Sequence, residues 1–246
     1  MIDDIEDIPV RTPAAGTQTQ NSAPKYLDFG DGVLLNDNSG YQPRCPVALI
    51  LDCSGSMHGP PISELNQALP GLFQELLVHD LTAARVEPCL ITCGGDAKVV
   101  LPFTPLQNLA DYKSHLVAGG ETPLGNAINL ALGEIEARTD HYQKEGIACY
   151  TPAVVVLTDG RPTDLEFLEA SVKLGTLARD RNWTVIAVGI GPRADLKALE
   201  AITAPRLPPV RLEGLNFAAL FQWVSVSLQA VASASPDPVT PPALAT

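Results

Sequence analysis

The chain has 246 residues, 46% hydrophobic and 18% charged, which is typical of a soluble globular protein with room for one large domain. Asp and Glu total 28 against 16 Lys and Arg, and the net charge of −12 argues against nucleic acid as a partner, because phosphate binding needs a basic surface. No apolar segment is long enough to cross a bilayer, and the acidic N-terminus has no signal-peptide pattern. We therefore expect a cytoplasmic protein with no membrane partner.

Composition along the chain predicts four regions. Residues 1–24 form a flexible acidic N-terminal tail, and 25–44 form an extension that packs on the domain or precedes it. The domain itself spans 45–232, and 233–246 form a flexible tail rich in proline. Five cysteines occur without a Cys-x-x-Cys pair or clustered histidines, so we expect buried thiols and neither a zinc site nor a disulfide framework: Cys45, Cys53, Cys89, Cys93 and Cys149.

The first half of the domain begins with a continuous apolar run at 46–52, which predicts a strand covered on both faces. An amphipathic helix follows, with Pro61 in its first turn, and Pro70 should kink it or split it in two. Two strand-like runs, 84–95 and 97–104, are separated by a turn and predict a hairpin. A short helix is expected around 106–116.

In the second half, Thr122 is placed to cap a helix that Pro123 begins. A helix at 162–181 should have Thr163 or Asp164 as its cap. Strand-like and helix-like segments alternate to the end, which predicts an α/β fold with a doubly wound, mostly parallel sheet, one antiparallel edge strand and helices on both faces. The remaining segments are strands at 152–160, 184–191 and 208–214 and helices at 194–202 and 216–231.

Polar side chains gather where the buried strands end. Asp52 ends the first strand and Ser54 and Ser56 follow it, Thr122 stands at a helix start, and Asp159 stands at the end of the strand at 152–160. Ligands of open α/β sheets bind beyond the carboxyl ends of the strands, so we expect these side chains to converge. Two carboxylates and three hydroxyls suit Mg²⁺ (or Mn²⁺) and disfavour zinc. So few carboxylates leave the ion partly unneutralised, and a carboxylate from a partner would complete its coordination.

The segments DCSGSM, GGETPLG and LTDGRPTD, in this order, resemble the von Willebrand factor type A (vWA) domain and its metal-ion-dependent adhesion site (MIDAS). Asp52, Ser54 and Ser56 match the family pattern D-x-S-x-S, while Thr122 and Asp159 match its threonine and later aspartate. The resemblance covers about 45–232 and implies a Rossmann-like domain that uses Mg²⁺ to bind an acidic residue of a protein partner.

Within that family the same segments look most like the bacterial tellurium-resistance branch, the TerY type. This resemblance implies a scaffold or regulator in a stress-resistance or antiviral (phage-defence) system, with a protein kinase and a PP2C-like phosphatase as partners. Four residues should surround the metal and contact a partner, although simple surface loops account for them equally well: Met57, His58, Glu121 and Arg161.

Two other functions remain open. A metal-dependent hydrolase or phosphotransferase could use the same ion, but no general base stands among the ligands and neither a G-x-S-x-G elbow nor a phosphate loop occurs. We therefore expect a protein that is not an enzyme. Alternatively, the metal could only stabilise the loops of a structural subunit. Taken alone, the stretch at Asp52 could also be a polar turn.

Overall fold

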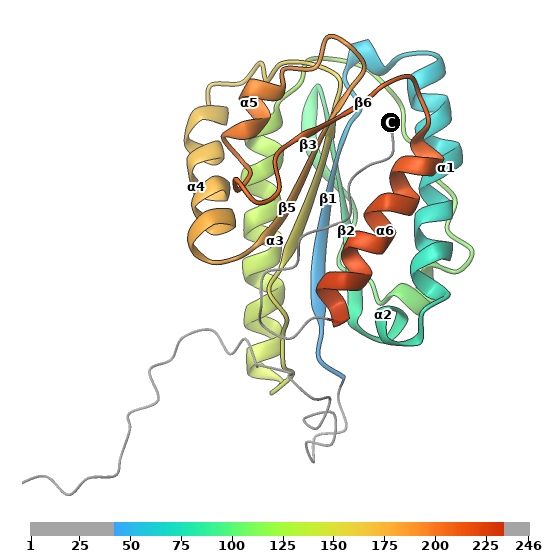
Figure 1. Cartoon of the computed structure of the whole chain (residues 1–246), viewed down its shortest axis with the longest axis vertical. Coiled ribbons are helices and arrows are strands. Elements are labelled where there is room, and N and C mark those ends of the chain that lie inside the picture. Colours follow the sequence, from blue (N-terminus) through green and yellow to red (C-terminus); the bar gives the residue numbers. More distant parts are fainter. Residues whose placement is uncertain (1–41, 234–246) are drawn as a thin grey trace, which may run out of the picture.

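The computed structural model describes residues 42–233, which form a six-stranded sheet flanked by helices (Figure 1). The strand order is β3-β2-β1-β4-β5-β6, and every neighbouring pair is parallel except β2 and β3. The antiparallel pair lies at one edge, as predicted. The strands are β1 (Cys45–Asp52), β2 (Val86–Gly94), β3 (Asp96–Leu101), β4 (Ala153–Thr158), β5 (Thr184–Ile190) and β6 (Val210–Leu212).

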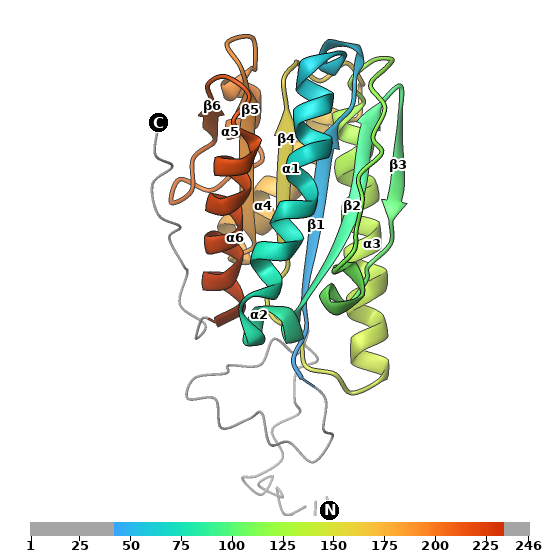
Figure 2. The same cartoon turned by 90° about the vertical axis from the view of Figure 1, so that its right-hand side faces the viewer.

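Helices cover both faces of the sheet (Figure 2). One face packs against α1 (Pro60–Leu77) and α6 (Phe217–Ser233), and the other against α3 (Leu124–Lys144), α4 (Phe167–Asp180) and α5 (Leu196–Glu200). The side chains of β1 alternate between the two cores, because successive residues of a strand point to opposite faces. Leu49 and Leu51 join the α1–α6 core, while Ala48 and Ile50 join the α3–α4 core. This two-sided burial explains the continuous apolar run.

Several elements differ from the sequence prediction. The helix α2 (Asp80–Arg85) precedes β2, where we expected the strand to begin at residue 84. The expected helix around 106–116 is only a short 3-10 turn at Leu106–Leu109. Pro70 lies inside α1, which continues unbroken from Pro60 to Leu77, so the helix is not split there. Each difference concerns a short segment or a single turn, for which local periodicity is a weak signal.

The predicted caps of α3 and α4 are wrong. The helix α3 begins at Leu124, and the side chain of Thr122 does not cap it. The cap comes instead from Asp164, whose carboxylate accepts hydrogen bonds from the backbone N–H groups of Gly125 (3.0 Å) and Asn126 (2.7 Å). Asp164 therefore does not cap α4, which begins at Phe167. A cap supplied from a distant segment leaves no local sequence signal.

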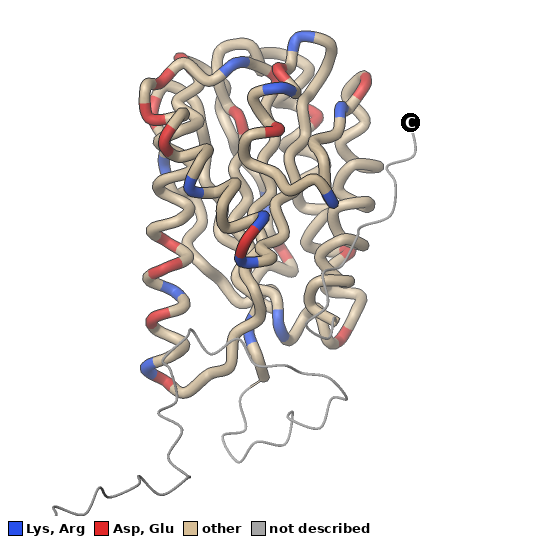
Figure 3. The backbone as a smooth tube through the Cα atoms, turned by 60° about the vertical axis from the view of Figure 1, so that its left-hand side comes forward, with Lys and Arg blue, Asp and Glu red and all other residues tan. Residues whose placement is uncertain are grey.

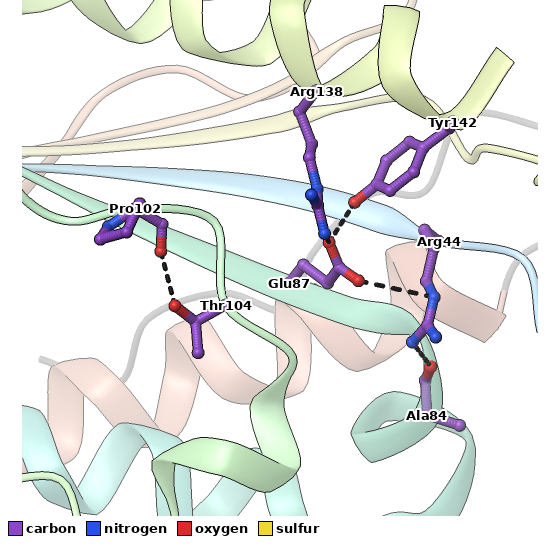
Figure 4. A network of polar contacts seen from close by, with 7 residues as sticks. All are labelled: Arg44, Ala84, Glu87, Pro102, Thr104, Arg138 and Tyr142. Carbon is purple, nitrogen blue, oxygen red and sulfur yellow. Dashed lines mark hydrogen bonds and ion pairs between the residues drawn. The ribbon is translucent and has the colours of Figure 1, made fainter. Parts of the chain in front are cut away.

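A second polar cluster lies at the amino-terminal ends of β1 and β2 (Figure 4). The carboxylate of Glu87, only 2% exposed, accepts hydrogen bonds from Arg138 (2.5 and 2.8 Å) and from the hydroxyl of Tyr142. Arg44 lies 3.5 Å from the other carboxylate oxygen and donates to the carbonyl of Ala84. Burial and the negative charge of Glu87 raise the pKa of Tyr142, which keeps its hydroxyl protonated as a donor.

The predicted tails and most of the extension, 1–41 and 234–246, lie outside the described residues. Residues 42–44 lead into β1, where Arg44 forms an isolated parallel bridge with Cys149. The five cysteines are all buried and unpaired, as expected. Among residues 42–233, no helix is long and apolar enough to span a membrane.

Candidate metal centre

The parallel strands β1 and β4 are neighbours in the centre of the sheet, and Leu51 pairs with Leu157 in their shared register. Asp52 and Asp159 come just after this pair, so both carboxylates lie at the carboxyl edge of the sheet. The two side chains are 1% and 8% exposed. The structure thus brings together the two carboxylates that the sequence placed on separate strand ends.

The carboxylate of Asp52 is held by hydrogen bonds on both of its oxygens. Its Oδ1 accepts from the backbone N–H of Ser54 at 2.8 Å. Its Oδ2 accepts from the hydroxyl of Thr158 at 2.5 Å and from the backbone N–H of Asp159 at 3.3 Å. Thr158, which we had not selected from the sequence, therefore orients the first carboxylate of the site. Thr158 ends the apolar run at 153–158, and the sequence of this run gives no sign that Thr158 has a role other than packing in the core.

The two serines form a chain of oxygens that ends on the second carboxylate. The hydroxyls of Ser54 and Ser56 lie 3.0 Å apart, and Ser56 donates to Oδ1 of Asp159 at 2.5 Å. Ser54 is buried, whereas Ser56 is exposed at the edge of the site. These contacts bring Ser54, Ser56 and Asp159 to one point, with Asp52 linked to it through the backbone of Ser54.

Thr122 reaches the same edge on the loop that precedes α3. Its hydroxyl lies beside Gly160, where a Cβ would stand 3.6 Å from it. The loop is held by hydrogen bonds from Gly55 N–H to the Gly120 carbonyl (2.9 Å) and from Gly119 N–H to the Cys53 carbonyl (2.7 Å). Thr122 also accepts the N–H of Thr163 through its carbonyl at 3.0 Å. All five predicted ligand residues thus lie on three neighbouring segments.

The close approach of these segments depends on glycine. A Cβ at Gly94 would lie 2.3 Å from the carbonyl oxygen of Cys53, a contact that no side chain tolerates. A Cβ at Gly120, whose φ is 72°, would lie 2.4 Å from the Cα of Gly95. The turn of the β2–β3 hairpin therefore packs backbone against backbone on the loop that carries Thr122. The sequence suggested a turn at these glycines but not this contact.

The electrostatics of the site favour a cation. Burial raises the pKa of Asp52, hydrogen bonds from Ser54 and Thr158 lower it, and the negative charge of Asp159 raises it further. Within residues 42–233, neither Asp52 nor Asp159 forms an ion pair with Lys, Arg or His. Buried carboxylates are normally paired with a cationic side chain or coordinate a metal. The two carboxylates and three hydroxyls therefore fit a hard divalent cation.

The residues expected to contact a partner divide into two groups. His58, Glu121 and Arg161 are exposed around the site. Met57 is 0% exposed and packs in the core between the sheet and α1, so it is not available to a partner. Its position one residue after Ser56 suggested exposure, but the short 3-10 turn at Gly55–Met57 directs it inward.

Comparisons with known proteins agree with this geometry. The model of the von Willebrand factor type A domain family matches residues 47–217. An uncharacterized protein of Synechocystis sp., sll0103, is 29% identical over 165 residues, which cover 64% of this chain and 35% of that protein. The chain thus matches only about a third of the length of this relative.

Two solved structures share the fold. The von Willebrand factor type A structure from Catenulispora acidiphila is 20% identical with a TM-score of 0.58, covering 76% of this chain and 43% of that one. The proximal thread matrix protein 1 from the mussel byssus, with a zinc-occupied MIDAS motif, is 15% identical with a TM-score of 0.51. That match covers 77% of this chain and 45% of the mussel protein. At these identities the likeness establishes the fold alone.

Proposed function

The chain belongs to the von Willebrand factor type A domain family, and from this premise we propose that it is a metal-dependent protein-binding module. Asp52, Ser54, Ser56, Thr122 and Asp159 would hold one Mg²⁺ (or Mn²⁺) ion. When bound, the ion supplies a positively charged open position to a carboxylate of a protein partner. The main observation behind this proposal is the hydrogen bond from the Ser56 hydroxyl to Asp159 Oδ1, at 2.5 Å. It joins two of the three segments that carry the proposed ligands.

The oxygen donors determine which metals the site would hold. Hydroxyls and carboxylates are hard ligands, which Mg²⁺ and Mn²⁺ prefer, and among the described residues no group of three His, Cys, Asp or Glu stands together. The mussel protein holds zinc in its MIDAS motif, so zinc belongs in the same test. Calorimetric titration with Mg²⁺, Mn²⁺ and Zn²⁺ should give one site per chain. Failure of all three to bind the folded protein would exclude the metal-dependent function.

The hydrogen bonds of Ser54 and Ser56 support a binding role over an enzymatic one. The hydroxyls of Ser54 and Ser56 contact one another and Ser56 donates to Asp159, so both serines are engaged with the other proposed metal ligands. Within the described part of the chain, the imidazole of His58 forms no hydrogen bond with either serine. We therefore propose that the protein is not a hydrolase or phosphotransferase. Turnover of phosphate or carboxylic esters by the Mg²⁺-loaded protein would contradict this.

Exposed apolar side chains support a macromolecular partner. Val117 is 84% exposed on the loop before Thr122, and Leu165 is 94% exposed on the segment between Asp159 and α4. Contiguous exposed apolar patches mark protein interaction sites, whereas single exposed apolar side chains are common on any protein surface. Val117 and Leu165 are therefore candidate contacts for a protein partner on the segments that carry the proposed ligands.

The narrower proposal concerns the biological system. DCSGSM, GGETPLG and LTDGRPTD are similar to the TerY-type tellurium-resistance branch, which supports a cytoplasmic scaffold or regulator in bacterial stress resistance or phage defence. The partners would then be a protein kinase and a PP2C-like phosphatase encoded beside this gene. Co-purification of those two proteins with the chain, in Mg²⁺ and again in EDTA, tests the assignment.

The variant Asp52→Ala separates the metal bridge from a metal that only stabilises the loops. Under the proposed function it abolishes partner binding while the protein remains folded by circular dichroism. A purely stabilising metal predicts instead a large fall in the thermal unfolding temperature, with binding lost only in proportion to unfolding. Partner binding that survives both EDTA and Asp52→Ala would refute the metal bridge.

A further inference from the structure

A hollow of about 560 Å³ opens directly beside the candidate metal centre. Ser56 and Asp159 are among its lining residues, so it adjoins two of the proposed ligands. The remaining lining residues are Gly160 and Arg161 from the segment after β4 and Pro192 and Arg193 from the segment after β5. A partner group that reaches the metal would therefore have this hollow next to it.

The hollow contrasts with the charge of the chain. The protein carries a net charge of −12, yet two arginines line this hollow. We call Arg161 and Arg193 together the arginine wall. Figure 3 shows basic positions among the acidic ones in the upper loops, at the end of the domain where the strands have their carboxyl ends. A guanidinium presents a planar set of donors that matches a carboxylate, so the wall is suited to an anionic group.

Both arginines have guanidinium donors available for a new partner. Arg161 is 81% exposed and lies 3.4 Å from Asp195, an ion pair at the surface that contributes little to stability. Asp195 already accepts a hydrogen bond from Ala198 N–H as the cap of α5, so it does not depend on this arginine. Within residues 42–233, no hydrogen bond or ion pair engages the side chain of Arg193, which is exposed.

The segment that carries Arg193 is held in place by hydrogen bonds to the neighbouring strand β6. Arg211 on β6 donates to the carbonyl oxygens of Gly191 and Ala194, on either side of Arg193. The N–H of Gly191 also donates to the Leu212 carbonyl at 2.8 Å. The backbone position of Arg193 is thus fixed by the sheet edge, so its side chain is the part of this segment that loses entropy when an anion binds.

We propose that the partner segment carries two acidic residues, one for the metal and a second whose carboxylate binds between Arg161 and Arg193. This inference rests on the proposed function, since it assumes a carboxylate at the metal. It assigns specificity to the arginine wall: the metal selects any accessible carboxylate, whereas the wall selects a segment with a second negative charge nearby.

Short peptides with one Asp, and with Glu or Gln one, two or three positions further on, provide the probe. In Mg²⁺ the best Glu peptide should bind about tenfold more tightly than its Gln counterpart by calorimetry. The preference should shrink in 0.5 M salt, because exposed charges are screened. Arg161→Gln combined with Arg193→Gln should abolish the preference. Lys144→Gln combined with Arg181→Gln removes the same charge from exposed positions on the helix ends away from the site and should preserve it.

The outcomes distinguish the two proposals. If Glu and Gln peptides bind equally well in Mg²⁺ and neither binds in EDTA, the arginine wall has no role while the metal bridge stands. If no peptide binds in Mg²⁺ although the ion itself binds, the proposed function fails and this inference with it. A Glu preference that persists in the double arginine variant would also overturn the assignment, provided that the thermal unfolding temperature shows the variant is folded.

Discussion

Ser56 donates a hydrogen bond to Asp159 across 103 positions of sequence, at 2.5 Å. The contact joins the segment after β1 to the segment after β4 at the carboxyl edge of the sheet. It exists because β1 and β4 are neighbours in a parallel sheet, which places the residues after both strands at one edge. Ser56 and Asp159, each of which taken alone could belong to an ordinary polar turn, are thereby brought into one site.

Ser56→Ala removes one proposed ligand from an exposed position. We expect Mg²⁺ affinity to fall by about 10- to 100-fold, the range found when supporting groups of metal sites are removed. The free energy of unfolding in EDTA should fall by only about 1 kcal/mol, the usual contribution of one hydrogen bond such as that from Ser56 to Asp159. Ser63→Ala, also exposed but on α1, is the control and should bind Mg²⁺ normally. Equal affinity in both variants would remove Ser56 from the ligand set.

Asp159→Asn removes one of two neighbouring negative charges. Without metal we expect the variant to be at least as stable as the wild type, because the negative charge of Asp159 acts on the buried carboxylate of Asp52. Saturation at 100 times the dissociation constant stabilises the wild type by about 2.7 kcal/mol, and this gain should vanish in the variant. Chemical denaturation in Mg²⁺ and in EDTA measures both effects. A variant that is still stabilised by Mg²⁺ would contradict the assignment of Asp159.

Asp164→Ala removes the cap of α3. Two backbone N–H groups lose their acceptor, so we expect a loss of about 1 kcal/mol in the free energy of unfolding. Urea denaturation measures the change. Asp111→Ala, at an exposed position, should be close to neutral. A neutral Asp164→Ala would show that the cap adds nothing to stability.

Glu87→Ala should lower the free energy of unfolding more than Asp164→Ala does. It leaves the half-buried Arg138 and the buried Tyr142 without their shared acceptor, so we expect a loss of about 3 kcal/mol in the free energy of unfolding. Tyr142→Phe removes a single donor and should cost about 1 kcal/mol. Mg²⁺ affinity of the folded protein should be unchanged in Tyr142→Phe, because the cluster lies at the opposite end of the strands from the metal centre. Weakened Mg²⁺ binding in that variant would indicate coupling between the two ends.

The buried thiols make stability depend on alkaline pH. Burial raises the pKa of Cys45, Cys53 and Cys89 to about 12 in the folded protein, from 9.0 for an ordinary thiol. Between these values the unfolded chain loses thiol protons that the folded chain keeps. Stability contributed by the protonated thiols is therefore complete below about pH 8 and declines as pH rises above about 9.

Two measurements check this behaviour. The free energy of unfolding should fall between pH 8 and pH 10, and Cys89→Ala should have a shallower slope. At pH 8 the native thiols should react with an alkylating reagent far more slowly than the same thiols in guanidinium chloride. Rapid labelling of the folded protein would show that the thiols are accessible.

Much of the fold could be predicted because it depends on local patterns. The continuous apolar runs of β1 and β4 predict buried central strands, and the alternation of strands with helices predicts the parallel sheet. The five residues proposed as ligands could also be selected from their oxygen-bearing side chains and their positions near strand ends: Asp52, Ser54, Ser56, Thr122 and Asp159. What failed was local detail without a strong pattern, such as α2 and the short turn at Leu106–Leu109.

The order of the main strands and helices, the burial of the central strands and the chemistry of the proposed ligands follow from periodicity and residue type, which act within one segment. Contacts between segments follow from the fold of the whole domain. Asp164 caps α3 instead of its own helix, Thr158 orients Asp52, and Met57 turns into the core. The hollow with Arg161 and Arg193 likewise arises where the segments after β4 and β5 meet. Such contacts depend on which strands are neighbours in the sheet, a property that no single segment encodes.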